Sequence, residues 1–201
     1  MLETFFTLYL KIFFMMTPFF VLSVFLSLSK KLSKPEKTTV IFRSSIAVTV
    51  ASLTFLLFGK YIFSLFGITL DAFKIGAGTV LFLSALEMIK GGGEIPETSI
   101  KKGSDFSIVP LAIPSTIGPG LIGILMVIGA EMSGFLGITL VILSLLAAVI
   151  SLAGILLLSN KLQHLIGEQG LEIIPKITGL FVSAIGAQII FSGIQGFLLQ
   201  T

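Results

Sequence analysis

The sequence predicts an all-α membrane protein with six transmembrane helices, forming a single membrane domain over residues 1–201. Hydrophobic residues make up 55% of the chain and charged residues only 11%, whereas a soluble domain has about 25% charged residues. A bilayer core of about 30 Å needs roughly 20 apolar residues of helix. Stretches of this kind recur at about 4–28, 40–62, 68–89, 106–130, 134–158 and 173–199.

The basic residues between these stretches predict their orientation. Ten of the 13 lie in or beside alternate loops, where lysine and arginine mark the cytoplasmic side: Lys30, Lys31, Lys34, Lys37, Arg43, Lys90, Lys101, Lys102, Lys161 and Lys176. Six crossings with both termini outside fit this pattern. No basic segment precedes the first apolar stretch, so we expect it to be a retained span rather than a cleaved signal.

The first predicted span carries Thr17 and Pro18 near its middle. Proline lacks a backbone donor and clashes with the carbonyl four residues earlier, so we expect a helix break at mid-membrane depth. Asp71 and Lys74 should anchor the outer start of the third span. Glu87, near its other end, is expected to reach the interface, with proton coupling as the alternative.

The fourth predicted span contains the segment PLAIPSTIGPG at 110–120. Three prolines and two glycines prevent one undisturbed helix, and the break falls near the middle of the span. A half-helix that starts after such a break presents unpaired N–H groups and a partial positive charge, which suit a carboxylate. Ser115 and Thr116 add hydroxyl groups beside it.

The sixth predicted span contains Gln188 at mid-membrane depth. Its amide is expected either to bond a solute or to join two helices. In the same span Gly179, Ser183 and Ala187 recur every four residues. Small residues at this spacing are typical of a face for close helix packing.

The two broken spans suggest an internal repeat. Pro18 and Pro119 lie 101 residues apart, and the third spans of the two halves match at nearly the same offset. Each half, 1–100 and 101–201, would then hold three spans with the broken one first. Because three is odd, the second half enters the membrane from the opposite side, as in the inverted 3+3 repeats of many secondary transporters.

Three segments resemble the signature regions of the MarC family of bacterial and archaeal inner-membrane proteins: FGITLDAFKIGAGTVLF (66–82), IVPLAIPSTIGPGLIGIL (108–125) and ITGLFVSAIGAQIIFSGI (177–194). The similarity extends over the whole chain. It implies a multi-pass protein of the cell inner membrane with six spans. One branch of the family is described as transporters of small neutral amino acids, and the family is grouped with the lysine exporter superfamily.

The first span departs from the family pattern. The family usually has Asn-Pro followed by Gly, where this chain reads Thr17-Pro18-Phe19-Phe20. The fourth span keeps its motif, and Gln188 matches the glutamine of the family.

We therefore expect a secondary transporter of small neutral amino acids, such as glycine or alanine, that works by alternating access. The residues expected to bind the solute are Thr17, Pro18, Pro114, Ser115, Thr116, Gly118, Pro119, Gly120 and Gln188. No cofactor or metal is expected, and the coupling ion, H⁺ or Na⁺, and the oligomeric state stay open. The alternatives are a membrane protein of regulatory or structural role and an oligomeric channel or exporter.

Enzymatic function is not expected. The chain has no cysteine and one histidine, His164, which falls in a predicted solvated loop far in depth from the membrane centre. No His-Glu-x-x-His pattern occurs. The basic residues lie beside the membrane and not in a patch interleaved with exposed aromatics, so nucleic acid is not an expected partner.

Overall fold

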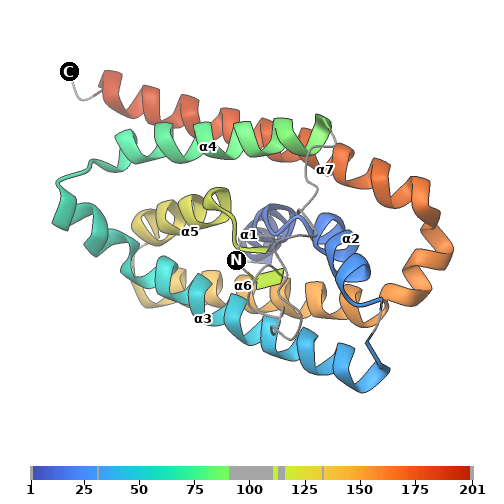
Figure 1. Ribbon diagram of the computed structural model, residues 1–201. Helices are drawn as coiled ribbons and strands as arrows, with labels where there is room; N and C mark the ends of the chain where they lie inside the picture. Colours follow the sequence, from blue (N-terminus) through green and yellow to red (C-terminus); the bar gives the residue numbers. More distant parts are fainter. Residues whose placement is uncertain (1, 31, 91–110, 113–115, 133, 200–201) are drawn as a thin grey trace.

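The computed structural model describes residues 2–30, 32–90, 111–112, 116–132 and 134–199, and these ranges contain helices and connecting turns (Figure 1). Their bounds are α1 Leu2–Met15, α2 Pro18–Leu28, α3 Lys34–Phe66, α4 Leu70–Lys90, α5 Pro119–Glu131, α6 Gly134–Leu157 and α7 Ser159–Leu199.

Within these ranges, five segments are long and apolar enough to cross a membrane: Leu2–Leu28, Lys34–Gly59, Leu70–Lys90, Gly134–Leu157 and Gln169–Leu199. The first of them combines α1 and α2. The fifth helix, α5, is apolar but shorter, and most of the predicted fourth span before it lies outside the described residues. The crossing by residues 106–130 therefore stays a prediction.

Helix α3 begins earlier than the predicted second span. The Ser33 N–H donates to the Glu36 carboxylate at 2.7 Å, and Ser33 and Glu36 form a capping box at the helix start. Such a box satisfies N–H groups that the first turn leaves unpaired. The helix continues for 33 residues to Phe66, where Gly67 in the left-handed conformation (φ 61°) ends it. At 1.5 Å per residue, α3 is about 50 Å long.

Helix α7 also begins earlier than predicted, at Ser159 and not near residue 173. Gly167 (φ 72°, ψ 172°) interrupts it, so a short helix precedes the long one at a kink. The prediction that His164 lies in a loop was wrong, because His164 is an exposed residue of this short helix. Apolar residues spaced along this segment sustain a helix where the polar residues had indicated a loop.

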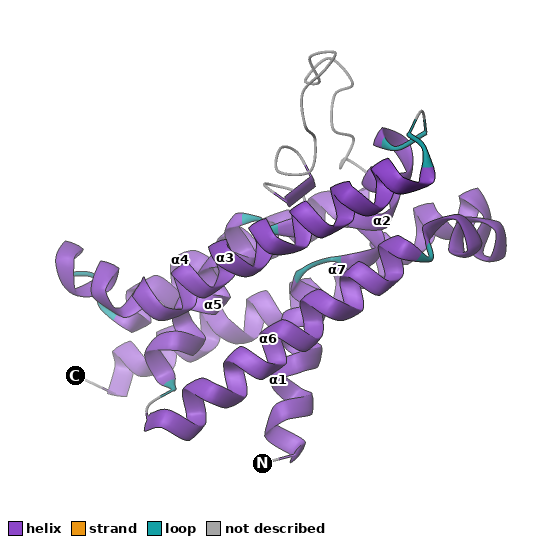
Figure 2. Cartoon of the chain, turned by 90° about the horizontal axis from the view of Figure 1, so that it is seen from below, coloured by secondary structure: helices purple, strands orange, loops and turns teal. Residues whose placement is uncertain are grey.

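The helices pack in a definite set of pairs. Helix α4 lies along the C-terminal part of α7 over most of its own length (Figure 1). Helix α3 contacts α5 and α6, α1 contacts α6, and α5 also contacts α4. The N-terminal end of α1 projects from the bundle (Figure 2). The Ser144 hydroxyl donates to the Phe5 carbonyl at 3.2 Å, which fixes α6 against α1.

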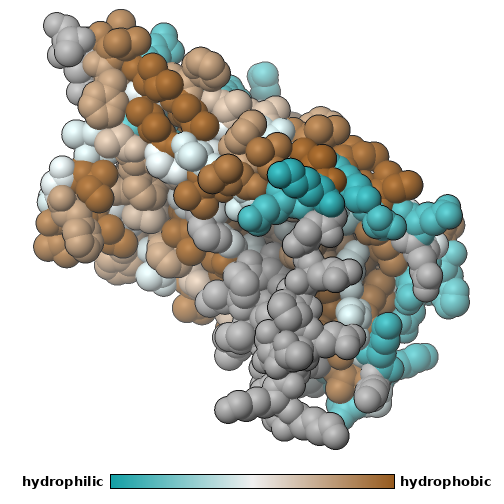
Figure 3. All heavy atoms as spheres, turned by 45° about the horizontal axis from the view of Figure 1, so that its top comes forward, coloured by the Kyte–Doolittle hydropathy of each residue, from teal (hydrophilic) through white to brown (hydrophobic). Residues whose placement is uncertain are grey.

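Hydrophilic residues gather mostly at one end of the visible surface, and apolar residues cover much of the rest (Figure 3). The hydrophilic end is where α2 connects to α3 and where α7 begins (Figure 1). The Lys37 ammonium donates to the Asn160 amide oxygen across these two segments at 3.3 Å. This distribution agrees with the concentration of basic residues in the predicted cytoplasmic loops.

The break in the first span is confirmed, and its geometry is strained. Helix α1 ends at Met15 and α2 begins at Pro18. Between them Thr17 has φ 46° and ψ 58°, and it is the one non-glycine residue with positive φ in the described ranges. This left-handed conformation costs about 1–2 kcal/mol for an L-residue. A β-branched side chain is especially unsuited to it.

A seam of small residues holds α4 against α7. A Cβ atom placed on Gly78 would lie 2.8 Å from the Gly186 carbonyl oxygen, and one on Gly186 would lie 3.0 Å from the Gly78 carbonyl oxygen. The backbones therefore touch without intervening side chains. The residues in contact recur every seven positions on each antiparallel helix: Asp71, Gly78 and Ala85 on α4, with Gly193, Gly186 and Gly179 on α7.

Replacing Thr17 by asparagine should stabilise the protein, because asparagine tolerates the left-handed conformation better than threonine. The expected gain is about 1 kcal/mol, or an increase of about 2–4 °C in the Tm measured in detergent. Thr17→Val serves as the control, since it keeps the β-branch and the strain. A Tm of Thr17→Asn at or below that of wild type would contradict the assigned backbone conformation.

A glycine-to-alanine replacement should change the stability of the protein on one face of α4 and not on the other. Gly78→Ala places its Cβ against the Gly186 carbonyl and the Ile190 side chain, whereas a Cβ at Gly76 meets no atom within 4 Å. We expect Gly78→Ala to destabilise the protein by about 1–3 kcal/mol and Gly76→Ala to leave stability unchanged or slightly raised. Thermal unfolding of both variants in one detergent measures this. Equal effects would show that the seam is not a close contact.

Candidate functional site

The first break provides a helix start without a side-chain cap. The first helical hydrogen bond of α2 runs from the Val21 N–H to the Thr17 carbonyl at 3.0 Å, and Thr17 makes no capping bond with its side chain. Pro18 has no N–H, so the N–H groups of Phe19 and Phe20 precede that bond. Thr17 is half-buried and Pro18 is buried.

The second break has a wide turn before it. The Ile117 N–H donates to the Ala112 carbonyl at 2.9 Å, five residues back, and the buried Thr116 hydroxyl donates to the Leu111 carbonyl at 2.9 Å. Turns of this π type interrupt helices and are frequent at functional sites. The chain then becomes extended at Gly118 (φ −84°, ψ 169°).

The hydrogen-bond pattern at the start of α5 matches that at the start of α2. Pro119 is the first residue, and the first bond runs from the Ile122 N–H to the Gly118 carbonyl at 3.1 Å. Gly118 has no side chain to cap the N–H groups of Gly120 and Leu121. These donors carry the positive end of the helix dipole. Both breaks thus offer the backbone donors that suit a carboxylate.

The two breaks lie in the most buried part of the protein. Helices α1 and α5 are in contact, and the start of α5 lies next to α1 at the centre of the molecule (Figure 1). The side chains around the breaks are apolar and almost fully buried: Met16, Val21, Leu22, Leu111, Ile117 and Leu121. Any polar group held there would contact backbone donors and threonine hydroxyls within an apolar surrounding.

Gly120 also packs against α4, in addition to its predicted place at the break. A Cβ atom on Gly120 would lie within contact of the Leu81 side chain, and one on Gly123 would meet the Ala77 Cβ. These two glycines allow α5 to approach α4 closely. A larger side chain at Gly120 would therefore separate the helices as well as alter the break.

The remaining predicted site residues lie apart from this geometry or outside it. Pro114 and Ser115 are outside the described residues. Gln188 lies on an exposed face of α7, so its amide is not enclosed with the breaks. Of the predicted set, the structure brings together Thr17 and Pro18 at one break and Thr116, Gly118, Pro119 and Gly120 at the other.

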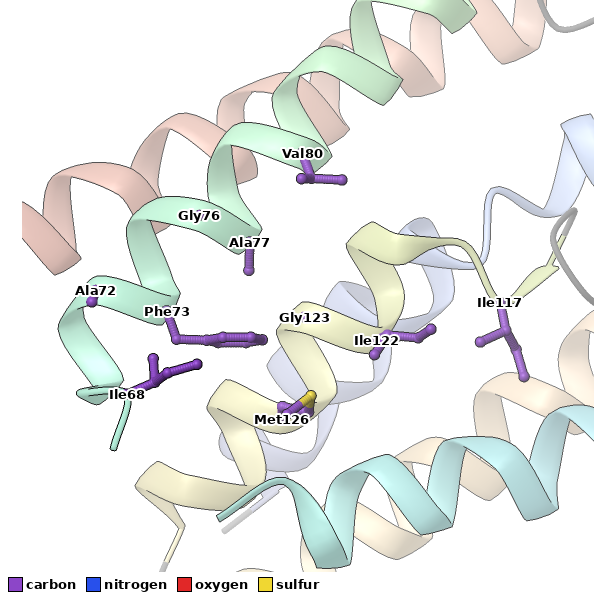
Figure 4. Close-up of a pocket in the computed structure, with 10 residues that line it drawn as sticks. All are labelled: Ile68, Ala72, Phe73, Gly76, Ala77, Val80, Ile117, Ile122, Gly123 and Met126. Atoms are coloured by element: carbon purple, nitrogen blue, oxygen red, sulfur yellow. The ribbon is translucent and has the colours of Figure 1, made fainter. Parts of the chain in front are cut away.

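An apolar groove of about 650 Å³ runs between α4 and α5 beside the second break (Figure 4). Phe73, Ala77 and Val80 face it from α4, and Ile122 and Met126 face it from α5 (Figure 4). Ile117, directly before the break, also lines it. A lining of this kind does not suit a charged solute, so the breaks and not the groove provide the polar contacts.

Ion pairs near one end of the bundle were missed by the sequence analysis. The Lys74 ammonium lies 2.7 Å from the Glu131 carboxylate at the end of α5 and 3.8 Å from the Asp71 carboxylate. Lys11 of α1 lies within electrostatic reach of Glu131 and Lys74. Asp71 and Lys74 were predicted to anchor α4 to the interface, but Lys74 is only 12% exposed and joins two helices.

Proteins of other organisms are similar in sequence to this chain over nearly its full length. A UPF0056 membrane protein of Methanocaldococcus jannaschii is 36% identical over 98% of this chain and 99% of its own. A second, from Pyrococcus abyssi, is 33% identical over 97% of this chain and 96% of its own. The UPF0056 inner membrane protein YhgN of Escherichia coli is 27% identical over 90% of both chains. No solved structure matches.

The resemblance of the sequence to the MarC family is confirmed. Residues 2–198 match the family described as MarC family integral membrane protein. The apolar helices found within the described residues agree with a protein that crosses the membrane several times. The chain belongs to the MarC family of multi-pass integral membrane proteins.

Proposed function

We propose that this protein is a secondary transporter of small neutral amino acids, such as glycine or alanine, and that it works by alternating access. The observation that carries the proposal is the pair of helix starts at Pro18 and Pro119. Each lacks a side-chain cap and each lies in the buried centre of the protein. Backbone donors at such positions can hold the carboxylate of a zwitterion.

The chemistry around the breaks supports a small solute of low net charge. The described neighbours are apolar except for Thr17 and Thr116, which supply hydroxyl groups. An ion of high net charge would lack compensation there. A zwitterion needs one anion site and one set of acceptors, and the carbonyl groups freed at the breaks can supply the acceptors.

The pattern of helix contacts supports the 3+3 repeat. Exchanging the halves at 1–100 and 101–201 pairs the first span with the fourth, the second with the fifth and the third with the sixth. Because Pro119 aligns with Pro18, α5 corresponds to α2, so the contacts of α3 and α4 with α5 correspond to those of α6 and α7 with α2. The α4–α7 and α3–α6 contacts map onto themselves. Inverted repeats of this kind underlie alternating access.

We also propose the membrane that holds the protein and the orientation of its termini. The E. coli relative is an inner membrane protein, and we place this chain in the cell inner membrane with both termini outside. The basic residues Lys30, Lys34 and Lys37 in and beside the α2–α3 connection carry the orientation.

Uptake by proteoliposomes tests the function. We expect saturable uptake of labelled glycine and alanine, with and without a pH or sodium gradient to identify the coupling ion. The absence of saturable transport of any amino acid would overturn the proposal and favour a regulatory or structural role. Unsaturable flux would favour an oligomeric channel.

A pair of variants tests the site. Gly118 has a backbone conformation that any residue can adopt, so a serine there can cap the N–H groups of α5 and compete with the carboxylate of the solute. An N-cap contributes about 1 kcal/mol, so we expect the KM of Gly118→Ser to exceed that of the control Gly118→Ala by about fivefold. Equal KM values would remove the start of α5 from the site.

A further inference from the structure

We propose that the ion-pair cluster formed by Asp71, Lys74 and Glu131 is a gate that closes the two breaks from one side of the membrane. This inference rests on the proposed function, and it names the group that must open for the solute to reach its site. The cluster joins two helices, because α4 supplies Asp71 and Lys74 and α5 supplies Glu131.

The cluster lies at the end of the bundle where α4 begins and where α5 and α7 end, here called the terminal end. A Cβ atom on Gly196 of α7 would contact the Asp71 carboxylate, so α7 closes this end as well. Lys74 and Asp71 have side chains only 12% and 14% exposed. The Lys74 ammonium lies 2.7 Å from the Glu131 carboxylate, whose side chain is 46% exposed.

The breaks lie deeper on the same helices. Leu81 packs against Gly120 at the second break, and it follows Lys74 by two turns of α4, or about 10 Å. Lys11 of α1, within electrostatic reach of Glu131 and Lys74, precedes Thr17 by about 9 Å. The cluster therefore lies on the terminal-end side of both breaks.

The opposite end is held differently. There the Ser23 hydroxyl of α2 donates to the Leu171 carbonyl of α7 at 3.3 Å, a neutral contact. Lys176 occupies the position in the second half that Lys74 has in the first, but it pairs with Glu172 of its own helix at 2.8 Å. Under the repeat, Glu131 corresponds to Lys30, which could not pair with Lys176. At the terminal end, by contrast, the ion pair between Lys74 and Glu131 joins two helices.

In the proposed gate, α4 and α7 move together relative to the terminal end of α5. Helix α4 is fixed to α7 by the backbone contacts of the Gly78–Gly186 seam. Helix α5 contacts α4 through Gly120, Gly123 and the Lys74–Glu131 pair, with the apolar groove beside them. Opening the ion pair would let the α4–α7 pair turn away from α5 at the terminal end while the seam stays intact.

Cysteine labelling tests the gate without a transport assay. The chain contains no cysteine, so Thr116→Cys introduces a single thiol beside the second break. A membrane-impermeant maleimide is added to intact cells and, separately, to inverted vesicles, and a protease-cleavable C-terminal tag shows which preparation exposes the terminal end. We expect Glu131→Gln to raise the labelling rate about tenfold in that preparation only, which corresponds to about 1.4 kcal/mol.

Two further variants separate gating from general loosening. Glu172→Gln removes the carboxylate of the other close lysine pair, which lies within one helix, and it should leave the rate unchanged. Lys74→Gln combined with Glu131→Gln should label no faster than Glu131→Gln alone, because both changes break one interaction. Each variant is compared at equal monodispersity and Tm, so that partial unfolding is detected.

The outcomes distinguish the gate from the transport proposal. An unchanged rate in Glu131→Gln, an equal increase from both sides of the membrane, or an equal increase in Glu172→Gln would overturn the gate. Uptake is measured on the wild-type protein. Labelling that responds as expected, together with no amino acid uptake by the wild type, would keep the gate and overturn the proposed solute. Uptake by the wild type together with an unresponsive thiol would do the reverse.

Discussion

The antiparallel contact between α4 and α7 is the interaction on which the rest of the arrangement depends. Glycines at Gly78 and Gly186 bring the two backbones together, and the same seven-residue spacing extends the contact along both helices. One helix comes from each half of the chain, so this contact joins the halves. Helix α5 then packs on α4 through Gly120 and Gly123, which fixes the second break beside the pair.

The breaks combine local strain with burial. Proline at the first position of α2 and of α5 removes a donor and sets the chain direction, and the residue before each proline leaves the helix. At the second break that residue is glycine in an extended conformation. At the first it is Thr17 in a left-handed conformation, which asparagine would adopt more readily than threonine. The chain therefore makes the first break with a side chain poorly suited to its backbone conformation.

Features that depend on local chemistry were predictable from the sequence, and those that depend on the choice of partner were not. The prolines revealed both breaks because their effect on the backbone is local. The early start of α3 was also readable, since Ser33 and Glu36 form a capping-box pattern that the hydropathy count overlooked. The role of Gly120 and the pairing of Lys74 with Glu131 required knowledge of which helices meet. Gly179 was predicted to contribute to packing, but its contact recurs every seven residues and involves α4.

The length of α3 makes the arrangement of this helix depend on the thickness of the bilayer. A helix of about 50 Å exceeds a hydrocarbon core of about 30 Å, so α3 tilts or extends into the interfacial region. Its contact with α5 is a crossing at which a Cβ on Gly129 would meet the Leu56 carbonyl, with no side chain to absorb a change of angle. Lipids of different chain length would thus act on the α3–α5 crossing, and the hydrophobic match of the membrane becomes one of the forces that set the relative stability of its conformations.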